Sequence, residues 1–141
     1  MGTGIEIARS LIGSGRPPGI AEALDFTLWQ VEDGLAVCGG SIGVHALNPM
    51  GFVHGGYICT LLDTACGFAL MSKLAEGQSY TTIDLTVAFL RGLTLESGEV
   101  RAEGRVVTIG RRVGFVQSRL LDRGDQLYAS ASSSLLIIDP R

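Results

Sequence analysis

One carboxylate, Asp63, stands in an otherwise apolar stretch, nine residues after the histidine of His54-Gly55-Gly56. It is the only charged residue between Tyr57 and Ser72. An ionised group in an apolar helix is costly unless a partner compensates it or its pKa shifts. A chain that keeps a carboxylate in such surroundings usually uses it, so Asp63 is a candidate functional residue.

Gly55 and Gly56 stand where the helix that carries Asp63 is expected to begin. The first N–H groups of a helix have no intrahelical acceptor and lie at its positive end, and glycine lets a ligand oxygen come close to them. The two glycines are therefore a candidate oxyanion hole for a carbonyl group.

Asp63 and the glycines cannot act on one carbonyl within one helix. The acid would lie about 12 Å further along the helix, whereas reacting atoms must approach to about 3–3.5 Å. Two such helices, antiparallel across a two-fold axis, would bring the glycines of one beside the aspartate of the other. The spacing thus predicts a homodimer with two identical composite sites.

The other elements must position this helix, which is expected over residues 56–75 and to end with Lys73 and Gly77. Residues 24–33 and 35–43 are expected to form a hairpin before it. At 100° per residue the helix has a bulky apolar side, suited to a sheet, and a side of small or polar residues. That small side comprises Gly56, Cys59, Thr60, Asp63, Cys66 and Gly67.

Strand-forming sequence follows the helix, over residues 79–90, 99–109, 111–121 and 126–138. The order of two strands, one long apolar helix and four strands predicts an α+β fold, with an antiparallel sheet curled around a central helix. In the first of the four strands, alternation predicts one face that carries Thr81, Ile83, Leu85, Val87 and Phe89.

The chain is expected to divide into a helical lead-in over residues 1–23 and one domain over residues 24–141. The lead-in holds an amphipathic piece over residues 5–12 and a breaker, GSGRPPG, over residues 13–19.

Composition and motifs argue against several classes. A formal charge of −3, with scattered cations, gives no electrostatic footprint for nucleic acid. The three cysteines lack CxxC spacing and His54 lacks co-ligands, so neither a disulfide framework nor a metal site is expected. The N-terminus lacks a signal-peptide pattern, and the apolar run over residues 57–71 is too short for a bilayer. A soluble cytoplasmic protein is expected.

Residues 48–67, NPMGFVHGGYICTLLDTACG, resemble the signature of hotdog-fold acyl-CoA thioesterases. The similarity continues in TIDLTVAFLRG (82–92) and GRRVGF (110–115), in the same order. The nearest type is the phenylacetic-acid-degradation (PaaI-like) kind, related to the 4-hydroxybenzoyl-CoA thioesterases. The resemblance implies a hotdog fold and hydrolysis of an acyl-CoA to free acid and CoA in a homo-oligomer, commonly a dimer of dimers. No cofactor is implied, because coenzyme A is part of the substrate.

The resemblance also implies roles for individual residues. Asp63 would be the nucleophile or the general base that activates water, and both alternatives stay open. The Gly55 N–H, with Gly56 as a possible second donor, would hold the thioester oxygen. His54 would orient this loop or bind near the thioester, and Asn48 matches a position that often holds a polar side chain near the site.

One position departs from the pattern. Some relatives carry a hydroxyl residue one turn after the acid, used to position water, and Gly67 stands there in this sequence. Thr60 or Thr64 could supply that hydroxyl instead.

The phosphates of CoA need cations. Arg111 and Arg112 are the preferred local pair, with Arg91 and Lys73 as weaker candidates. The small residues over 129–134, ASASSS, suggest a flat strand that could pack on another sheet in a tetramer.

Two other functions fit the same resemblance: a hotdog hydratase or dehydratase that acts on enoyl or hydroxyacyl thioesters, and a non-catalytic acyl-CoA-binding protein. The His-Gly-Gly at the helix entrance favours hydrolysis over the first. The short segment before the first strand argues against the DNA-binding part that acyl-CoA-sensing regulators carry.

Overall fold

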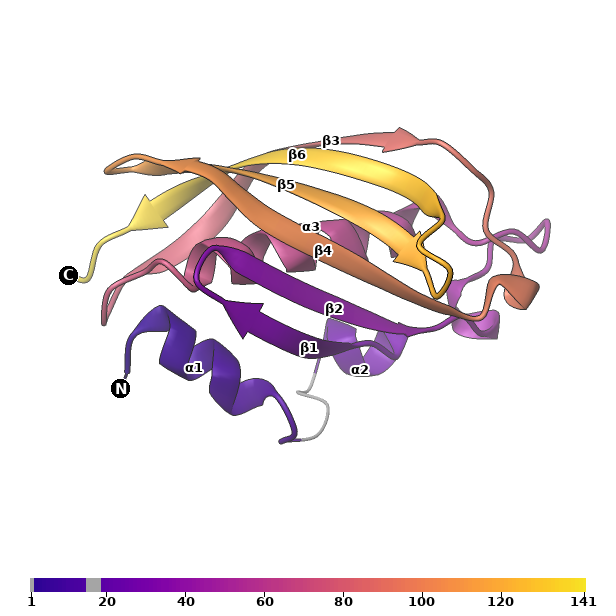
Figure 1. Cartoon of the computed structure of the whole chain (residues 1–141), viewed down its shortest axis with the longest axis horizontal. Helices are drawn as coiled ribbons and strands as arrows, with labels where there is room; N and C mark the ends of the chain where they lie inside the picture. Colours follow the sequence, from indigo (N-terminus) through magenta and orange to yellow (C-terminus); the bar gives the residue numbers. More distant parts are fainter. Residues whose placement is uncertain (1, 15–18) are drawn as a thin grey trace.

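Six strands form one antiparallel sheet in the computed structural model, which describes residues 2–14 and 19–141 (Figure 1). Their spatial order is β1-β2-β4-β5-β6-β3. The predicted hairpin, the four later strands and the antiparallel sheet are confirmed. The strands are β1 (Thr27–Glu32), β2 (Leu35–Ser41), β3 (Ser79–Phe89), β4 (Glu99–Ile109), β5 (Val113–Asp122) and β6 (Leu127–Ile138).

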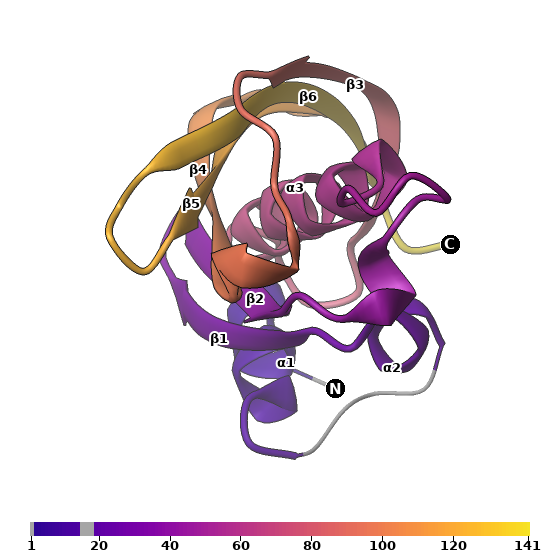
Figure 2. The ribbon, with the colours of Figure 1, turned by 90° about the vertical axis from the view of Figure 1, so that its right-hand side faces the viewer.

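The long helix α3 (Gly55–Met71) lies in the concave side of this sheet, and Figure 2 shows the strands curving around it. Its side chains Leu61, Leu62 and Leu70 are fully buried. The sheet approaches the helix closely at Gly104 in β4, where a Cβ atom would overlap the carbonyl of Ala65. The predicted arrangement, a sheet wrapped around one central helix, is confirmed. Two short 3-10 helices, η1 (Val44–Ala46) and η2 (Leu95–Ser97), lie in the connections.

The predicted C-terminal end of this helix is wrong, because α3 ends at Met71 rather than at residue 75. The next residue, Ser72, is buried, and its hydroxyl accepts a hydrogen bond from the Gly34 N–H (2.8 Å) while donating to the Ala69 carbonyl (2.6 Å). This side chain ties the helix end to the β1–β2 turn and supplies an alternative to continued helical bonding.

The N-terminal segment packs on the same core as the sheet. Helix α1 (Gly4–Leu11) begins at the cap Thr3, and its Ala8 is fully buried. The Gly4 N–H donates to the Leu74 carbonyl just beyond α3 (3.0 Å). A second short helix, α2 (Ile20–Leu24), precedes β1 and has no buried residue. The predicted breaker lies partly outside the described residues, and the division at residue 23 stays a prediction.

Strand β3 does not have the single face that alternation predicts. Its pairing with β6 is interrupted by a bulge between Thr82 and Asp84. A bulge adds one residue and exchanges the two faces of a strand. Tyr80 and Thr82, which precede the bulge, therefore face α3. Leu85 and Val87, which follow it, face α3 as well. Thr81 and Ile83 are exposed, so their predicted place beside Leu85 is wrong.

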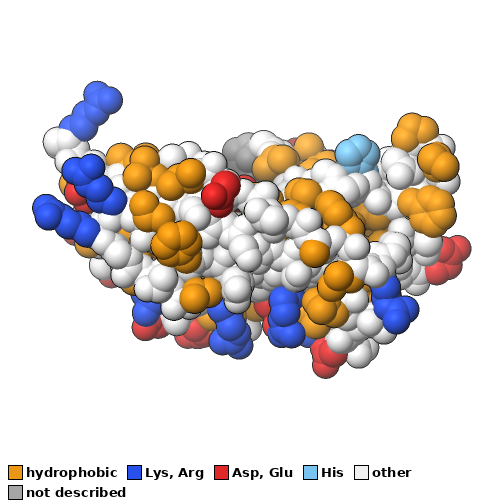
Figure 3. All heavy atoms as spheres, turned by 90° about the horizontal axis from the view of Figure 1, so that it is seen from above, with side chains coloured by type: hydrophobic (Ala, Val, Ile, Leu, Met, Phe, Trp, Pro, Cys, Tyr) orange, Lys and Arg blue, Asp and Glu red, His pale blue; other side chains and the backbone are white. Residues whose placement is uncertain are grey.

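The outer face of the sheet carries an exposed hydrophobic patch near the β4–β5 hairpin (Figure 3). Ser132 and Ser134 of β6 line a neighbouring hollow of about 310 Å³. The predicted role of residues 129–134 in a tetramer stays a prediction. The patch comprises Val107, Ile109, Phe115, Leu136 and Ile138.

Within the described residues, no helix combines the length and the apolar character that crossing a bilayer requires.

Candidate active site

Asp63 faces an open depression between α3, β3 and α2. The carboxylate is half-buried, and its Oδ1 accepts a hydrogen bond from the Thr82 hydroxyl (2.9 Å). One carboxylate oxygen is thus held in place, and the group lines an open depression of about 330 Å³. The depression is lined by Ile20, Cys59, Thr60, Asp63, Thr64, Thr82 and Leu85.

The thiols near Asp63 are poor nucleophiles. Cys59 lines the depression, but partial burial, with a further contribution from the negative charge of Asp63, raises its pKa. Burial raises the pKa of Cys38 to about 12 and that of Cys66 to about 11. Since the thiolate is the reactive form, the carboxylate is the better candidate for the reactive group.

Only part of the predicted small side of α3 is open. Cys59, Thr60 and Asp63 are partly exposed, whereas Cys66 and Gly67 are buried. Cys66 lies under β5, where its thiol contacts the Ser118 hydroxyl (3.3 Å). The open side of α3 is therefore confined to its first half.

Gly67 is explained by Tyr80 of β3. A Cβ atom at position 67 would lie 2.5 Å from the Tyr80 hydroxyl oxygen and 3.0 Å from the ring. The tyrosine thus occupies the space into which a side chain at this position would project. The two threonines that could replace the missing hydroxyl bond to helix carbonyls, Thr60 to Gly56 (2.8 Å) and Thr64 to Thr60 (2.6 Å).

Thr82 is the residue that sequence reasoning missed. It lies within the TIDLTVAFLRG stretch, but alternation along an unbroken strand would have turned it away from the helix. The bulge at Ile83 decides its direction, and a bulge leaves only a weak signal in a sequence.

For the acyl-CoA hydrolysis that the resemblance implies, we expect Thr82→Val to lower kcat by about tenfold with little change in KM. Loss of a hydrogen bond to a charged group removes about 1.5–3 kcal/mol of interaction, and Asp63 would no longer be held in one orientation. Steady-state thiol release measures both constants. Thr82→Ser, which keeps the hydroxyl, should recover most of kcat, and equal losses in the two variants would argue against this role.

The N-terminus of α3 offers one free donor rather than two. His54 is the N-cap, and its Nδ1 accepts a hydrogen bond from the Gly56 N–H (2.7 Å). Among the described residues, no atom accepts a hydrogen bond from the Gly55 N–H. Gly55 is therefore the candidate oxyanion donor, whereas the N–H of Gly56 is already used.

We expect His54→Ala to lower the free energy of unfolding by about 1 kcal/mol, the usual effect of losing an N-cap acceptor. For a domain of this size, the Tm should fall by about 2–6 °C. Thermal unfolding followed by circular dichroism measures the change. His54→Asn, which restores a capping oxygen, is the matched control, and an alanine variant as stable as wild type would contradict the capping role.

Gly55 lies in a second cavity, about 410 Å³ in volume, between the start of α3 and the end of β3. Most of its lining is apolar, and Arg91 supplies a cation. Gly55 thus lines a cavity that combines apolar surface with one positive charge. The lining comprises Phe52, Val53, Gly55, Ile58, Phe89, Leu90, Arg91, Gly92 and Leu93.

Asn48 organises the loop that leads into α3. Its Oδ1 accepts hydrogen bonds from the N–H groups of Met50 (3.0 Å) and Phe52 (3.1 Å). It therefore fixes the position of Phe52 in the Gly55 cavity. Its amide N–H₂ has no acceptor among the described residues.

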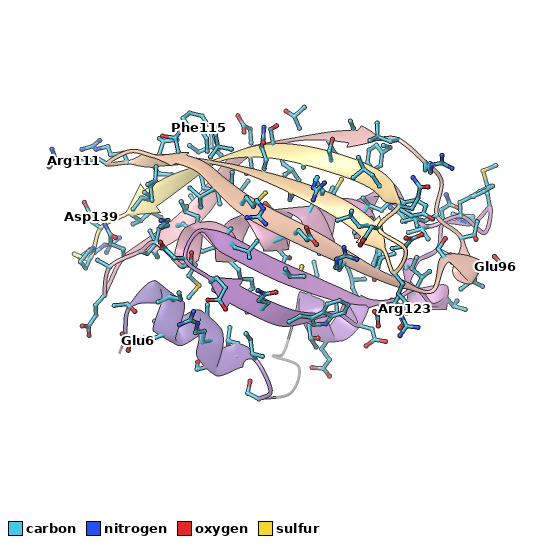
Figure 4. The ribbon with its side chains drawn as sticks, viewed as in Figure 1. Glu6, Glu96, Arg111, Phe115, Arg123 and Asp139 are labelled. Carbon is cyan, nitrogen blue, oxygen red and sulfur yellow. The ribbon has the colours of Figure 1, made fainter. Side chains whose placement is uncertain are left out.

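The arginine candidates are far apart. Arg91 lines the Gly55 cavity, at the end of β3. Arg111 and Arg112 form the tip of the β4–β5 hairpin, where the Ile137 N–H donates to the Arg112 carbonyl (2.6 Å), near the start of β3. The length of β3 separates these places by about 30 Å. Figure 4 shows the two ends of the molecule that these residues mark. Arg111 lies at one end, and Glu96, which comes shortly after the end of β3, lies at the other.

Lys73, the remaining cation, pairs with Asp33 (3.0 Å). In the part of the chain that the structure describes, no three His, Cys, Asp or Glu side chains gather closely enough to hold a metal ion.

Comparison with known proteins identifies the family of this chain. The sequence over residues 50–129 matches the family model of the Thioesterase superfamily. A predicted esterase from Halobacterium salinarum is 38% identical over 77 residues, which make up 53% of this chain and 49% of the relative. This chain therefore matches only about half the length of that relative.

Solved structures share the fold over most of this chain. A predicted thioesterase from Ralstonia eutropha JMP134, a phenylacetic acid degradation-related protein, is 27% identical with a TM-score of 0.79, covering 93% of this chain and 96% of that one. A Streptococcus mutans UA159 protein, solved with bound acetyl CoA, is 27% identical with a TM-score of 0.73, covering 82% and 90%. With the matching family model and this shared fold, the chain belongs to the Thioesterase superfamily and has the hotdog fold of its PaaI-like members.

Proposed function

We propose that the protein hydrolyses acyl-CoA thioesters to a free acid and CoA, with Asp63 as the reactive carboxylate. The observation that carries the proposal is the half-buried Asp63, held by Thr82 and facing an open depression. The acetyl CoA bound to the Streptococcus mutans relative supports a CoA thioester as the substrate class.

The two halves of the chemistry come from two chains in this proposal. Asp63 and Gly55 line different cavities, and eight residues of α3, about 12 Å, separate them. A partner chain antiparallel to the first would bring its Gly55 cavity opposite the Asp63 depression. The two-fold axis would then pass near Cys59, midway between the two residues along α3.

The outer edge of β3 supports such a pairing. β3 ends the sheet, so one of its edges has no neighbouring strand among the described residues. Exposed edges of this length are usually covered or paired, and the exposed Ile83 lies in this strand. Antiparallel pairing of β3 with its copy near Leu85 and Thr86 would align the same two cavities, because Thr82 lies beside Asp63 and Phe89 beside Gly55.

Hydrolysis then needs few groups. The carbonyl oxygen accepts a hydrogen bond from the Gly55 N–H, which stabilises the negative charge that develops when the carbonyl carbon is attacked. Asp63 either attacks that carbon itself or takes a proton from a water that does so. In both routes the C–S bond breaks, and the CoA thiolate leaves and takes up a proton. If water attacks, the free acid forms directly. If Asp63 attacks, a mixed anhydride forms on its carboxylate, and a water then hydrolyses it to the free acid and regenerates Asp63. A thioester is reactive enough for a carboxylate and an oxyanion hole to suffice.

Arg91 is the proposed CoA-binding cation of the chain that provides Gly55, since it lines the same cavity. The antiparallel pairing would also bring the partner's β4–β5 hairpin towards this end of the site. Arg111 and Arg112 are therefore proposed to bind the phosphates of the CoA that lies at the other chain's Gly55.

The proposal is tested by following thiol release from a panel of straight-chain and aryl acyl-CoAs with a thiol-reactive dye. Saturable turnover of at least one panel member is the expected result. Saturable binding of CoA esters without turnover would overturn the proposal and indicate a non-catalytic acyl-CoA-binding protein.

A further inference from the structure

We infer that the acyl group enters a small enclosed cavity beside the Asp63 depression, and that this cavity selects straight aliphatic chains over aryl groups. The inference rests on the proposed function, because it assigns the acyl half of the same substrate.

The cavity lies where α1, α2, β1 and α3 meet, and its volume is about 30 Å³. Thr64 lines both this cavity and the Asp63 depression. The neighbouring residues Ile20 and Ala21 of α2 each line one of the two spaces, Ile20 the depression and Ala21 the cavity. The cavity therefore adjoins the depression next to the reactive carboxylate. Its lining comprises Leu11, Ala21, Phe26, Thr27, Leu28, Thr64 and Phe68.

The chemistry of the Gly55 cavity and of the small enclosed cavity indicates which half of the substrate each one binds. From a carbonyl held between Gly55 of one chain and Asp63 of the other, the substrate extends in two directions. The Gly55 cavity is open and carries Arg91, so it suits the long, charged CoA. The enclosed cavity is lined by five apolar residues and two threonines. It suits an apolar tail that gains free energy by leaving water.

The size of the cavity sets the kind of tail. A benzene ring is held by an engineered cavity of about 150 Å³, whereas this cavity has about 30 Å³. It accepts the narrow end of an aliphatic chain and excludes a ring. Each methylene that enters should raise kcat/KM by about fourfold, the factor that corresponds to burial of one CH₂ group.

The experiment measures kcat/KM for straight-chain acyl-CoAs from acetyl to octanoyl, and for benzoyl-CoA. In the wild type we expect a rise with chain length to an optimum, and a value for benzoyl-CoA about tenfold or more below that optimum. Phe68→Ala enlarges the cavity from α3 and should move the optimum to longer chains. Ala21→Leu fills it from α2, which has no buried residue, and should move the optimum to shorter chains.

Two further variants keep the result interpretable. Leu11→Ala enlarges the same cavity from α1 and replaces Phe68→Ala if that protein fails to fold. Phe52→Leu alters the Gly55 cavity instead, and should change kcat/KM by one common factor for all chain lengths.

An optimum that stays at the wild-type chain length in the enlarging and the filling variants would overturn the inference while leaving the proposed function intact. A wild type that prefers benzoyl-CoA to every straight chain would also overturn it. Absence of turnover with every substrate would instead overturn the proposed function, and this inference with it.

Discussion

Replacing Gly55 with proline should lower kcat by about 10²- to 10³-fold, the usual loss when one oxyanion-hole donor is removed. Proline has no N–H, and Gly55 is the first residue of α3, the helix position at which proline is preferred. The preceding His54 already has the extended conformation (φ −65°, ψ 135°) that a following proline requires. The fold should therefore remain intact while the donor is lost.

Gly55→Ala is the matched control for this substitution. It keeps the N–H, and its Cβ atom would lie 3.4 Å from the Phe89 ring, an ordinary contact. We expect its kcat to fall by less than about tenfold. Thermal unfolding of both variants establishes that they fold. Equal losses of kcat in the two variants would mean that space at position 55 matters, and not the donor.

Asp63→Asn should lower kcat by about 10²-fold or more, because the amide can neither attack the thioester nor take a proton from water. The asparagine oxygen can still accept the hydrogen bond from Thr82, so the local packing should be retained. Thiol release from the best substrate of the wild type measures the effect.

The control for charge alone is Asp33→Asn, since Asp33 is an exposed residue that pairs with Lys73 away from the site. This variant should keep wild-type kcat and KM. If a folded Asp63→Asn protein turns over substrate as fast as Asp33→Asn, Asp63 is not the reactive group.

The architecture of this protein follows closely from its sequence. One long apolar helix among strand-forming segments predicts the sheet around α3, and the position of His54-Gly55-Gly56 predicts where that helix begins. These features depend on patterns within a few turns of chain, which a sequence displays directly.

The errors arise where contacts between distant residues override local patterns. The end of α3 depends on a bond between Ser72 and Gly34, which are 38 residues apart. The faces of β3 depend on the bulge at Ile83, and that bulge turns Thr82 towards Asp63. Neither contact leaves a periodic signal in the sequence.

The candidate site was predictable in its residue types but not in its division of roles. Two glycines at a helix start suggest two donors, yet the His54 ring takes the N–H of Gly56 and leaves that of Gly55. Similarly, the sequence suggests that Gly67 stands in place of a hydroxyl residue. In the structure, the Tyr80 side chain fills the space that a side chain at position 67 would need. Side-chain contacts decide which N–H is free at the start of α3 and why position 67 is a glycine. The spacing of residues along the chain gives no information on these contacts.

The composite site across a dimer is tested most directly by combining two inactive chains. Gly55→Pro and Asp63→Asn subunits, co-expressed with different tags, allow the mixed dimer to be isolated. One of its two sites would join the intact Gly55 of one chain to the intact Asp63 of the other. We predict turnover per dimer of about half the wild-type value, far above that of either parent. A mixed dimer no more active than its parents would contradict the account, because it would place the donor and the acid of each site in one chain.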